Sequence, residues 1–151
     1  MIQIFTDGSS RGNPGRGGYG IVMMSGVHRK EMAQGYRKTT NNRMELLAVI
    51  VALETIKVEN ATVLITSDSK YVIDSVEKKW ILGWIKKNWK DVKNPDLWQR
   101  FLKVYKMHSV KFKWVKGHNN HPENERCDML ATAAADSGNL LIDAYYEQNI
   151  T

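Results

Sequence analysis

The sequence predicts an α/β protein in which a five-stranded mixed sheet, three antiparallel strands followed by parallel strands, is flanked by helices. Three observations predict this class. Three short apolar or alternating segments open the chain, which is typical of an antiparallel meander. Later strand-like segments are separated by helical ones, and a helical connection lets strands run parallel. The length of 151 residues predicts a single domain, residues 1–151.

The first three strands are expected near the amino terminus. The apolar segment Ile2–Thr6 runs directly into Asp7, and the glycine-rich segment Gly8–Gly18 that follows is expected to be a loop. Two further segments, Tyr19–Met24 and Arg29–Arg37, would complete the meander.

The first helix is expected over Arg43–Lys57, which is rich in strong helix formers. Thr40 or Asn41 offers its N-cap. Its apolar positions exceed one narrow stripe, so the helix should be well buried. The β-branched segment Thr62–Ser67 then predicts a fourth strand, which ends at Asp68.

The second half of the chain alternates helices with one more strand. In that strand, alternation directs Val110, Phe112 and Trp114 toward the core and the intervening lysines toward solvent. The tail over 138–151 is expected to fray. The expected elements are helices over Tyr71–Lys78, Ile81–Lys87 and Asp96–Met107, a strand over Val110–Val115 and a helix over Glu123–Ala135.

Positive charge is concentrated in one part of the chain. The net charge is +6, yet the segment 78–116 holds 12 of the 22 basic residues and only two acidic ones, Asp91 and Asp96. This asymmetry predicts that a polyanion docks on that segment while carboxylates gather elsewhere.

Composition also argues against several classes of protein. No apolar run approaches the roughly 20 residues that span a bilayer, and the amino terminus lacks the basic start of a signal peptide. Cys127 is the single cysteine, so it forms no intrachain disulfide, and it is expected to pack rather than react. We therefore expect a cytoplasmic protein without a membrane partner.

Four acidic residues stand where they could converge. Asp7 and Asp68 each end an apolar strand, Glu45 lies near the start of the first helix, and Asp128 lies on the last helix. Taken singly, each has an ordinary structural explanation: a turn for Asp7, a helix cap for Asp68, a surface helix position for Glu45 and a salt bridge for Asp128. Taken together, they would repel one another unless a cation is bound. Oxygen ligands favour Mg²⁺, with Mn²⁺ as a substitute, and two such ions about 4 Å apart can hydrolyse a phosphodiester.

Seven segments resemble, in order, the type 1 ribonuclease H family, the bacterial ribonuclease HI class of the ribonuclease H-like superfamily. The resemblance runs from Gln3 to about Ala135, which is nearly the whole chain. The segments are Thr6–Ser9, Gly12–Gly15, Gly17–Gly20, Thr40–Glu45, Ser67–Ser69, Asp96–Trp98 and Trp114–Asp128.

The resemblance implies a ribonuclease H-like fold and a hybrid-specific endoribonuclease, which cuts the RNA strand of RNA–DNA hybrids to leave 5′-phosphate and 3′-hydroxyl ends. It assigns two Mg²⁺ ions to Asp7, Glu45, Asp68 and Asp128, and a catalytic histidine to His118. An imidazole near neutral pKa in a pliable segment suits proton transfer to the leaving group or product release.

The resemblance also implies substrate contacts and a basic handle over about 78–95. Asn13 could instead be a turn residue before Pro14. The tryptophans of the handle could instead belong to a helix core, with the lysines on its solvated face. Lys70 stands where well-known members have Gln, and the handle is shorter than theirs. The expected contacts are Asn13, Thr40, Asn41, Asn42, Lys70, Trp80, Trp84, Lys86, Lys87, Trp89, Lys90, Lys93 and Trp98.

Two rival functions remain to be compared with this one. A catalytically inactive hybrid-binding module would lack at least one of the four acids, and none is missing. A resolvase, a transposase core or a reverse-transcriptase domain could share the fold, but many reverse-transcriptase domains lack the handle. We therefore expect an autonomous monomeric enzyme with an RNA–DNA hybrid as its partner and no obligate protein partner.

Overall fold

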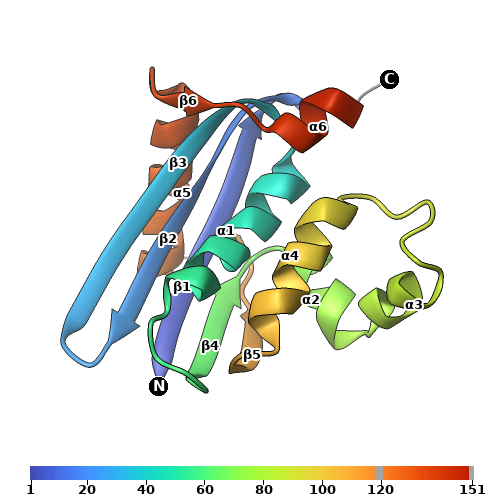
Figure 1. Cartoon of the computed structure of the whole chain (residues 1–151). Helices are drawn as coiled ribbons and strands as arrows, with labels where there is room; N and C mark the ends of the chain where they lie inside the picture. Colours follow the sequence, from blue (N-terminus) through green and yellow to red (C-terminus); the bar gives the residue numbers. More distant parts are fainter. Residues whose placement is uncertain (118–120, 150–151) are drawn as a thin grey trace.

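The sheet contains six strands in the order β5-β4-β1-β2-β3-β6, in a computed structural model that describes residues 1–117 and 121–149 (Figure 1). Strands β1, β2 and β3 form an antiparallel meander. Parallel pairing joins β4 to β1 and β5 to β4. The strands are β1 Ile2–Arg11, β2 Gly15–Ser25, β3 His28–Thr39, β4 Thr62–Ser67, β5 Ser109–Trp114 and β6 Leu140–Leu141. The mixed α/β class is confirmed, with six strands in place of the expected five.

The glycine-rich segment is mostly strand, so the expected loop over Gly8–Gly18 was wrong. Strands β1 and β2 continue through it and pair as far as Arg11 and Arg16, which leaves only a short turn at residues 12–14. Gly12, with a φ of 92°, supplies the left-handed conformation in that turn. Asp7 therefore lies within β1 and not at the end of the strand, where it was expected.

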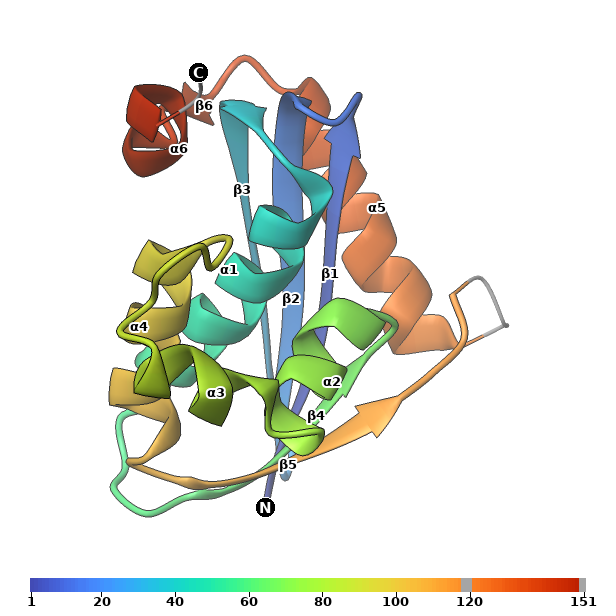
Figure 2. The same ribbon diagram turned by 90° about the vertical axis from the view of Figure 1, so that its right-hand side faces the viewer.

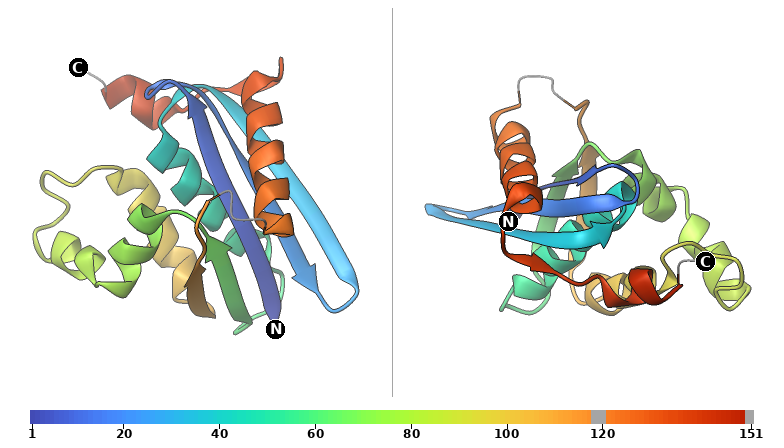
Figure 3. Two further views of the ribbon diagram at one scale, coloured as in Figure 1. Left: turned by 180° about the vertical axis from the view of Figure 1, so that it is seen from behind. Right: turned by 90° about the horizontal axis from the view of Figure 1, so that it is seen from above.

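Helices cover both faces of the sheet. Helix α5 lies on one face, and α1 lies on the other with α2 and α4 beside it (Figures 1 and 2). The view from above shows α3 and the segment after it projecting away from the sheet (Figure 3). The helices are α1 Asn41–Thr55, α2 Lys70–Glu77, α3 Trp80–Lys86, α4 Pro95–Tyr105, α5 Pro122–Asp136 and α6 Ala144–Asn149.

Helix α1 is the centre of the larger core. Its N-cap is Thr40, whose side-chain oxygen accepts a hydrogen bond from the Arg43 backbone N–H at 3.2 Å. Ten of its residues are buried, as its broad apolar surface predicted. Trp98 and Phe101 of α4 pack on the same core and are fully buried. This packing holds the start of α1 firmly against the sheet.

Glycines on the meander let α5 approach the sheet closely. A Cβ at Gly20 would overlap the backbone oxygen of Cys127, and a Cβ at Gly18 would lie 2.5 Å from that of Ala131. Both glycines belong to β2, so the strand presents bare backbone to the helix. Close packing of α5, which carries Asp128, is therefore the reason for glycine at these positions.

Replacing Gly20 with Ala should destabilise the protein by about 2 kcal/mol, because the added methyl group forces α5 away from β2. Urea unfolding measures this loss. Gly83→Ala is the matched control: apart from its chain neighbours and the backbone of its own helix, no atom of the described residues lies within 4 Å of the added Cβ, and the position is helical. It should leave stability unchanged or raise it by up to about 1 kcal/mol. Equal losses in the two variants would contradict the packing argument.

Two further expectations about local structure were wrong. The described part of the tail, up to residue 149, forms β6 and α6 rather than fraying: β6 pairs with β3, and Glu147 of α6 accepts two hydrogen bonds from Arg37. Trp114 was expected in the core, yet it is 44% exposed at the end of the edge strand β5. In the parts of the chain that the structure describes, no helix has the length and apolar character to cross a membrane.

Candidate active site

Four acidic side chains from separate elements line one cavity. Phe5 pairs with Thr66 across the parallel strands β1 and β4, so Asp7 and Asp68, each two residues further on, lie side by side. Glu45 reaches them from α1 and Asp128 from α5. We call this space of about 440 Å³ the acid cavity; its lining residues are Asp7, Gly8, Ser9, Asn41, Asn42, Glu45, Asp68, Ser69, Lys70, Tyr71 and Asp128.

Three of the four carboxylates are close enough to share a ligand. One carboxylate oxygen from each of Asp7, Glu45 and Asp68 lies within 4.8 Å of the other two. Gly8 makes this possible, because a Cβ there would overlap the backbone of Glu45. The Gly8 backbone N–H instead donates hydrogen bonds to the Asp7 and Glu45 carboxylates. Sequence patterns did not reveal this role of Gly8.

Burial and mutual repulsion favour the protonated forms of two of these acids. Burial raises the pKa of Asp7 to about 8, and the neighbouring Asp68 and Asp128 charges add to the effect. The pKa of Glu45 is also raised well above its ordinary value, mainly by burial and then by the Asp7 and Asp68 charges. Without a cation, the site therefore retains protons at neutral pH.

The donor set fits a hard divalent cation. Asp7, Glu45 and Asp68 offer only carboxylate oxygens at the point where they converge, and oxygen ligands suit Mg²⁺ or Mn²⁺ better than the softer metals. A bound cation would also offset the repulsion that raises the pKa of Asp7 and Glu45. These residues could therefore hold a metal ion, with Asp128 at the wall of the same cavity.

The raised pKa of Asp7, caused first by burial and then by the neighbouring charges, predicts a pH-dependent stability in the metal-free protein. The pKa of Asp7 rises from 3.8 to about 8 on folding, so between these values the folded state binds a proton that the unfolded state releases. The Asp7 contribution to stability is therefore complete below about pH 4 and is lost as the pH rises toward 8. Asp7→Asn should become progressively more stable than the wild type across this range.

Urea unfolding in chelator at pH 5 and pH 8 measures that difference in stability. Adding Mg²⁺ should reduce it at pH 8, because only the wild-type carboxylate gains from binding the cation. If the difference in stability between Asp7→Asn and the wild type is the same at both pH values, the Asp7 carboxylate does not have the raised pKa that its burial predicts.

Polar side chains expected to contact substrate lie beside the acid cavity. Asn41, Asn42 and Lys70 line it directly. Asn13 is brought to the same end of α1, because its side-chain oxygen accepts a hydrogen bond from the Asn41 backbone N–H at 3.0 Å. Thr40 is the N-cap of α1. The structure thus places three of these residues at the acid cavity itself and the other two next to it, at the start of α1.

The basic handle projects from the rest of the protein. Lys86, Lys87, Lys90 and Lys93 are all exposed. Trp80 is 46% exposed and lies under the Lys78 ammonium group, 5.8 Å from the ring centroid. Trp84 and Trp89 are only partly exposed and pack against the core. The handle therefore combines a lysine-rich surface with tryptophans that anchor it.

Trp98 was expected to contact substrate, and this was wrong. Its side chain is fully buried, packs on Trp84 and Phe101, and donates a hydrogen bond from Nε1 to the Tyr71 hydroxyl at 2.9 Å. Trp98 is a core residue under the handle. His118, the expected catalytic histidine, lies outside the described residues.

The end of β5 contacts Asp68 in ways that sequence patterns did not reveal. Trp114 donates a hydrogen bond from Nε1 to the Asp68 backbone oxygen at 3.2 Å. Lys70 lies over the Trp114 ring, 4.6 Å from its centroid. A Cβ at Gly117 would lie 2.9 Å from the Asp68 carboxylate, so glycine leaves that carboxylate room. No periodicity distinguishes such residues from ordinary strand and loop residues.

Comparison with known proteins identifies the family of the chain. The model of the RNase H family matches residues 1–136. Ribonuclease H of Desulforamulus reducens is 55% identical, with 94% of this chain and 92% of the relative covered. Ribonuclease HI of Shewanella oneidensis is 53% identical, with coverage of 97% and 95%.

Solved structures share the fold. LC9-RNase H1, a type 1 enzyme with the type 2 active-site motif, has a TM-score of 0.79 and 31% identity, with 99% of this chain and 81% of that chain covered. LC11-RNase H1, isolated from compost and solved in complex with an RNA/DNA hybrid, has a TM-score of 0.66 and 27% identity, with coverage of 90% and 97%. The expected family and enzyme class are confirmed, and the chain belongs to the ribonuclease H family.

Proposed function

We propose that this protein is an endonuclease that hydrolyses the RNA strand of RNA–DNA hybrids and leaves 5′-phosphate and 3′-hydroxyl ends. The observation that carries the proposal is the meeting of Asp7, Glu45, Asp68 and Asp128 in one cavity of a ribonuclease H family member. Its relative LC11-RNase H1 was solved with an RNA/DNA hybrid. Residues 1–151 would act as one catalytic domain, as a monomer, in the cytoplasm, where replication and transcription generate hybrids.

The four acids would hold two Mg²⁺ ions, or Mn²⁺ in their place, at the scissile phosphate. Such ions supply a reactive water and stabilise the charge on the departing oxygen. Gly8 orients two of the ligands, since its backbone N–H donates to both Asp7 and Glu45. His118 would transfer a proton to the leaving group or assist product release.

The polar residues beside the acids would distinguish RNA from DNA. Asn13, Thr40, Asn41 and Asn42 offer neutral donors and acceptors, which suit the 2′-hydroxyls and phosphates of the shallow minor groove. Lys70 adds a positive charge at the wall of the acid cavity. A hybrid placed over these residues would present its RNA strand to the four carboxylates.

The test is a cleavage assay in which each strand of a hybrid is labelled in turn. Cleavage of the RNA strand alone, in Mg²⁺ and not in chelator, is the expected result, with duplex RNA and duplex DNA left intact. End analysis of the products should show 5′-phosphate and 3′-hydroxyl groups. Cleavage of the DNA strand, or equal cleavage in chelator, would overturn the proposed function.

The handle would hold the DNA strand, with its lysines supplying most of the attraction. Replacing Lys86, Lys87 and Lys90 together with Ala should weaken hybrid binding, and should reduce the slope of log K against log salt by about 1 for each phosphate that is no longer neutralised. Fluorescence anisotropy in chelator at several salt concentrations measures this slope. The exposed residues Lys30, Lys57 and Lys103, which lie outside the handle, make a matched triple control; an equal change in that control would refute the assignment.

A further inference from the structure

A second polar cavity lies beside the acid cavity, and part of its wall comes from the tail. We call this space of about 410 Å³ the tail cavity; its lining residues are Asn13, Thr40, Asn42, Arg43, Val92, Lys93, Asn94, Pro95, Tyr145, Tyr146 and Asn149. Asn42 lines both cavities, so the two form one continuous surface. The tail cavity also touches the end of the handle, through Lys93 and Asn94.

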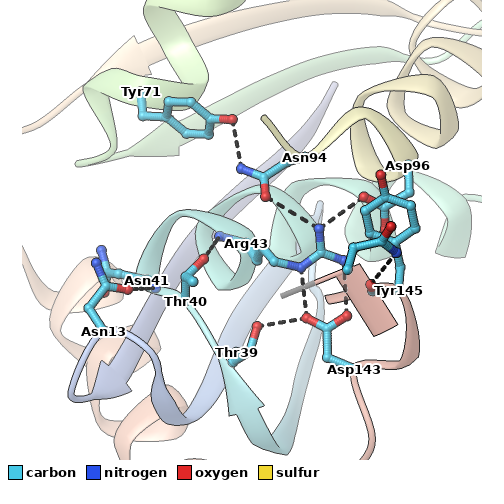
Figure 4. Close-up of polar contacts among 11 residues, drawn as sticks. Asn13, Thr39, Thr40, Asn41, Arg43, Tyr71, Asn94, Asp96, Asp143 and Tyr145 are labelled. Atoms are coloured by element: carbon cyan, nitrogen blue, oxygen red, sulfur yellow. Dashed lines mark hydrogen bonds and ion pairs between the residues drawn. The ribbon is translucent and has the colours of Figure 1, made fainter. Parts of the chain in front are cut away.

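Strong polar contacts hold the tail against this surface (Figure 4). Asp143, just before α6, accepts hydrogen bonds from the Arg43 guanidinium at 2.7 and 2.9 Å and from the Thr39 hydroxyl at 2.7 Å. The Arg43 guanidinium also lies 5.5 Å from the Tyr145 ring centroid and 6.0 Å from that of Tyr146. These contacts place the two tyrosines at the cavity.

The chemistry of the tail cavity suits a sugar–phosphate backbone. Among the lining residues that the structure describes, none carries a carboxylate, and Lys93 is exposed there. The Arg43 charge is already balanced by Asp96 and Asp143. The other polar lining groups are neutral amides and hydroxyls, which can contact phosphate oxygens and sugars alike.

We propose that the tail is part of the hybrid-binding surface, and that Tyr145, Tyr146 and Asn149 contact the sugar–phosphate backbone of a bound hybrid on the handle side of the active site. The inference rests on the proposed function, because it needs a hybrid at the acid cavity. These three residues lie beyond residues 1–136, which the family model matches. The proposed contact therefore lies outside the part of the chain that the family model matches.

The test measures hybrid affinity of the full-length protein in chelator by fluorescence anisotropy. Tyr145→Ala and Asn149→Ala should each raise Kd by about fivefold to tenfold, which corresponds to the removal of one or two polar contacts. The rate of RNA cleavage at saturating hybrid in Mg²⁺ should change by less than about twofold, because neither residue lines the acid cavity. Thermal melting of each variant checks that the fold is intact.

Ile142→Ala is the matched control, since Ile142 is a 55% exposed tail residue outside the cavity lining. Its Kd should equal that of the wild type. Unchanged Kd values for Tyr145→Ala and Asn149→Ala, or an equal rise in Ile142→Ala, would overturn the tail contact. Failure of the wild type itself to bind hybrid would instead overturn the proposed function, so the two failures are distinguishable. If Tyr145→Ala alters melting through its packing on Arg43, Asn149→Ala alone decides.

Discussion

Asp7→Asn is expected to fold, to bind an RNA–DNA hybrid and to cleave it at least ~10³-fold more slowly than the wild type. Asp7 lies at the centre of the site: one of its carboxylate oxygens is within 4.8 Å of one oxygen of Glu45 and one oxygen of Asp68. An amide keeps the size of the side chain but removes the negative charge and one oxygen ligand, so a cation that must stabilise the reacting phosphate is held poorly. Single-turnover cleavage of a labelled hybrid in Mg²⁺ measures the loss.

Three further measurements separate this loss from trivial causes. Urea unfolding should show Asp7→Asn to be at least as stable as the wild type at pH 8, since the variant lacks a repelled, buried carboxylate. Hybrid affinity in chelator should stay within about threefold of the wild-type value, because phosphate contacts elsewhere dominate affinity. Asp136→Asn, at an exposed acid paired with Arg11, should cleave normally. Near-normal cleavage by Asp7→Asn would contradict the proposed function.

Asp7 and Asp68 could be predicted from the sequence because each directly follows a run of apolar residues. Parallel pairing of β1 with β4 brings the two side by side, although β1 continues past Asp7 to Arg11. The closeness of Glu45 could not be predicted in this way. It depends on Gly8, and a glycine before a turn-like segment fits a loop as well as it fits close packing of a helix.

The errors share a physical origin, because a local pattern shows which residues share a face but not what covers that face. Trp114 alternates correctly with Lys113, yet β5 is an edge strand and its end remains exposed. Trp98 belongs to a segment that resembles the family. Such a resemblance does not show whether a side chain faces the substrate or the core, and Trp98 is buried in the core. Gly18 was assigned to a loop, whereas it lies in β2 and, like Gly20, leaves room for the close approach of α5.

Contacts between residues far apart in the sequence were beyond prediction altogether. Arg43 pairs with Asp96, 53 residues away, and with Asp143, 100 residues away. Each residue alone suggests an ordinary charged surface position. The tail was expected to fray because it is a chain terminus, and what holds it is a buried guanidinium on another element, which its own sequence does not show.

Arg43→Met is expected to lower the free energy of unfolding by about 4 kcal/mol. The Arg43 side chain is only 3% exposed, and those of Asp96 and Asp143 are 23% and 10% exposed. Methionine preserves most of the side-chain volume but leaves two partly buried carboxylates without their partner. Urea unfolding at neutral pH measures the loss. Arg100→Met, which breaks the more exposed pair with Glu54, should cost less than about 1 kcal/mol.

A triple variant shows whether the loss arises from charge or from packing. Combining Arg43→Met with Asp96→Asn and Asp143→Asn removes the guanidinium and both carboxylates together. If uncompensated charge causes the loss, the triple variant should be more stable than Arg43→Met alone, because no buried charge is then left without a partner. If the guanidinium acts mainly by packing on Tyr145 and Tyr146, the triple variant should be no more stable than the single one. The ionic network predicts the first result. The guanidinium donates five hydrogen bonds to oxygens of Asn94, Asp96 and Asp143, and in four of these bonds the acceptor is a carboxylate oxygen.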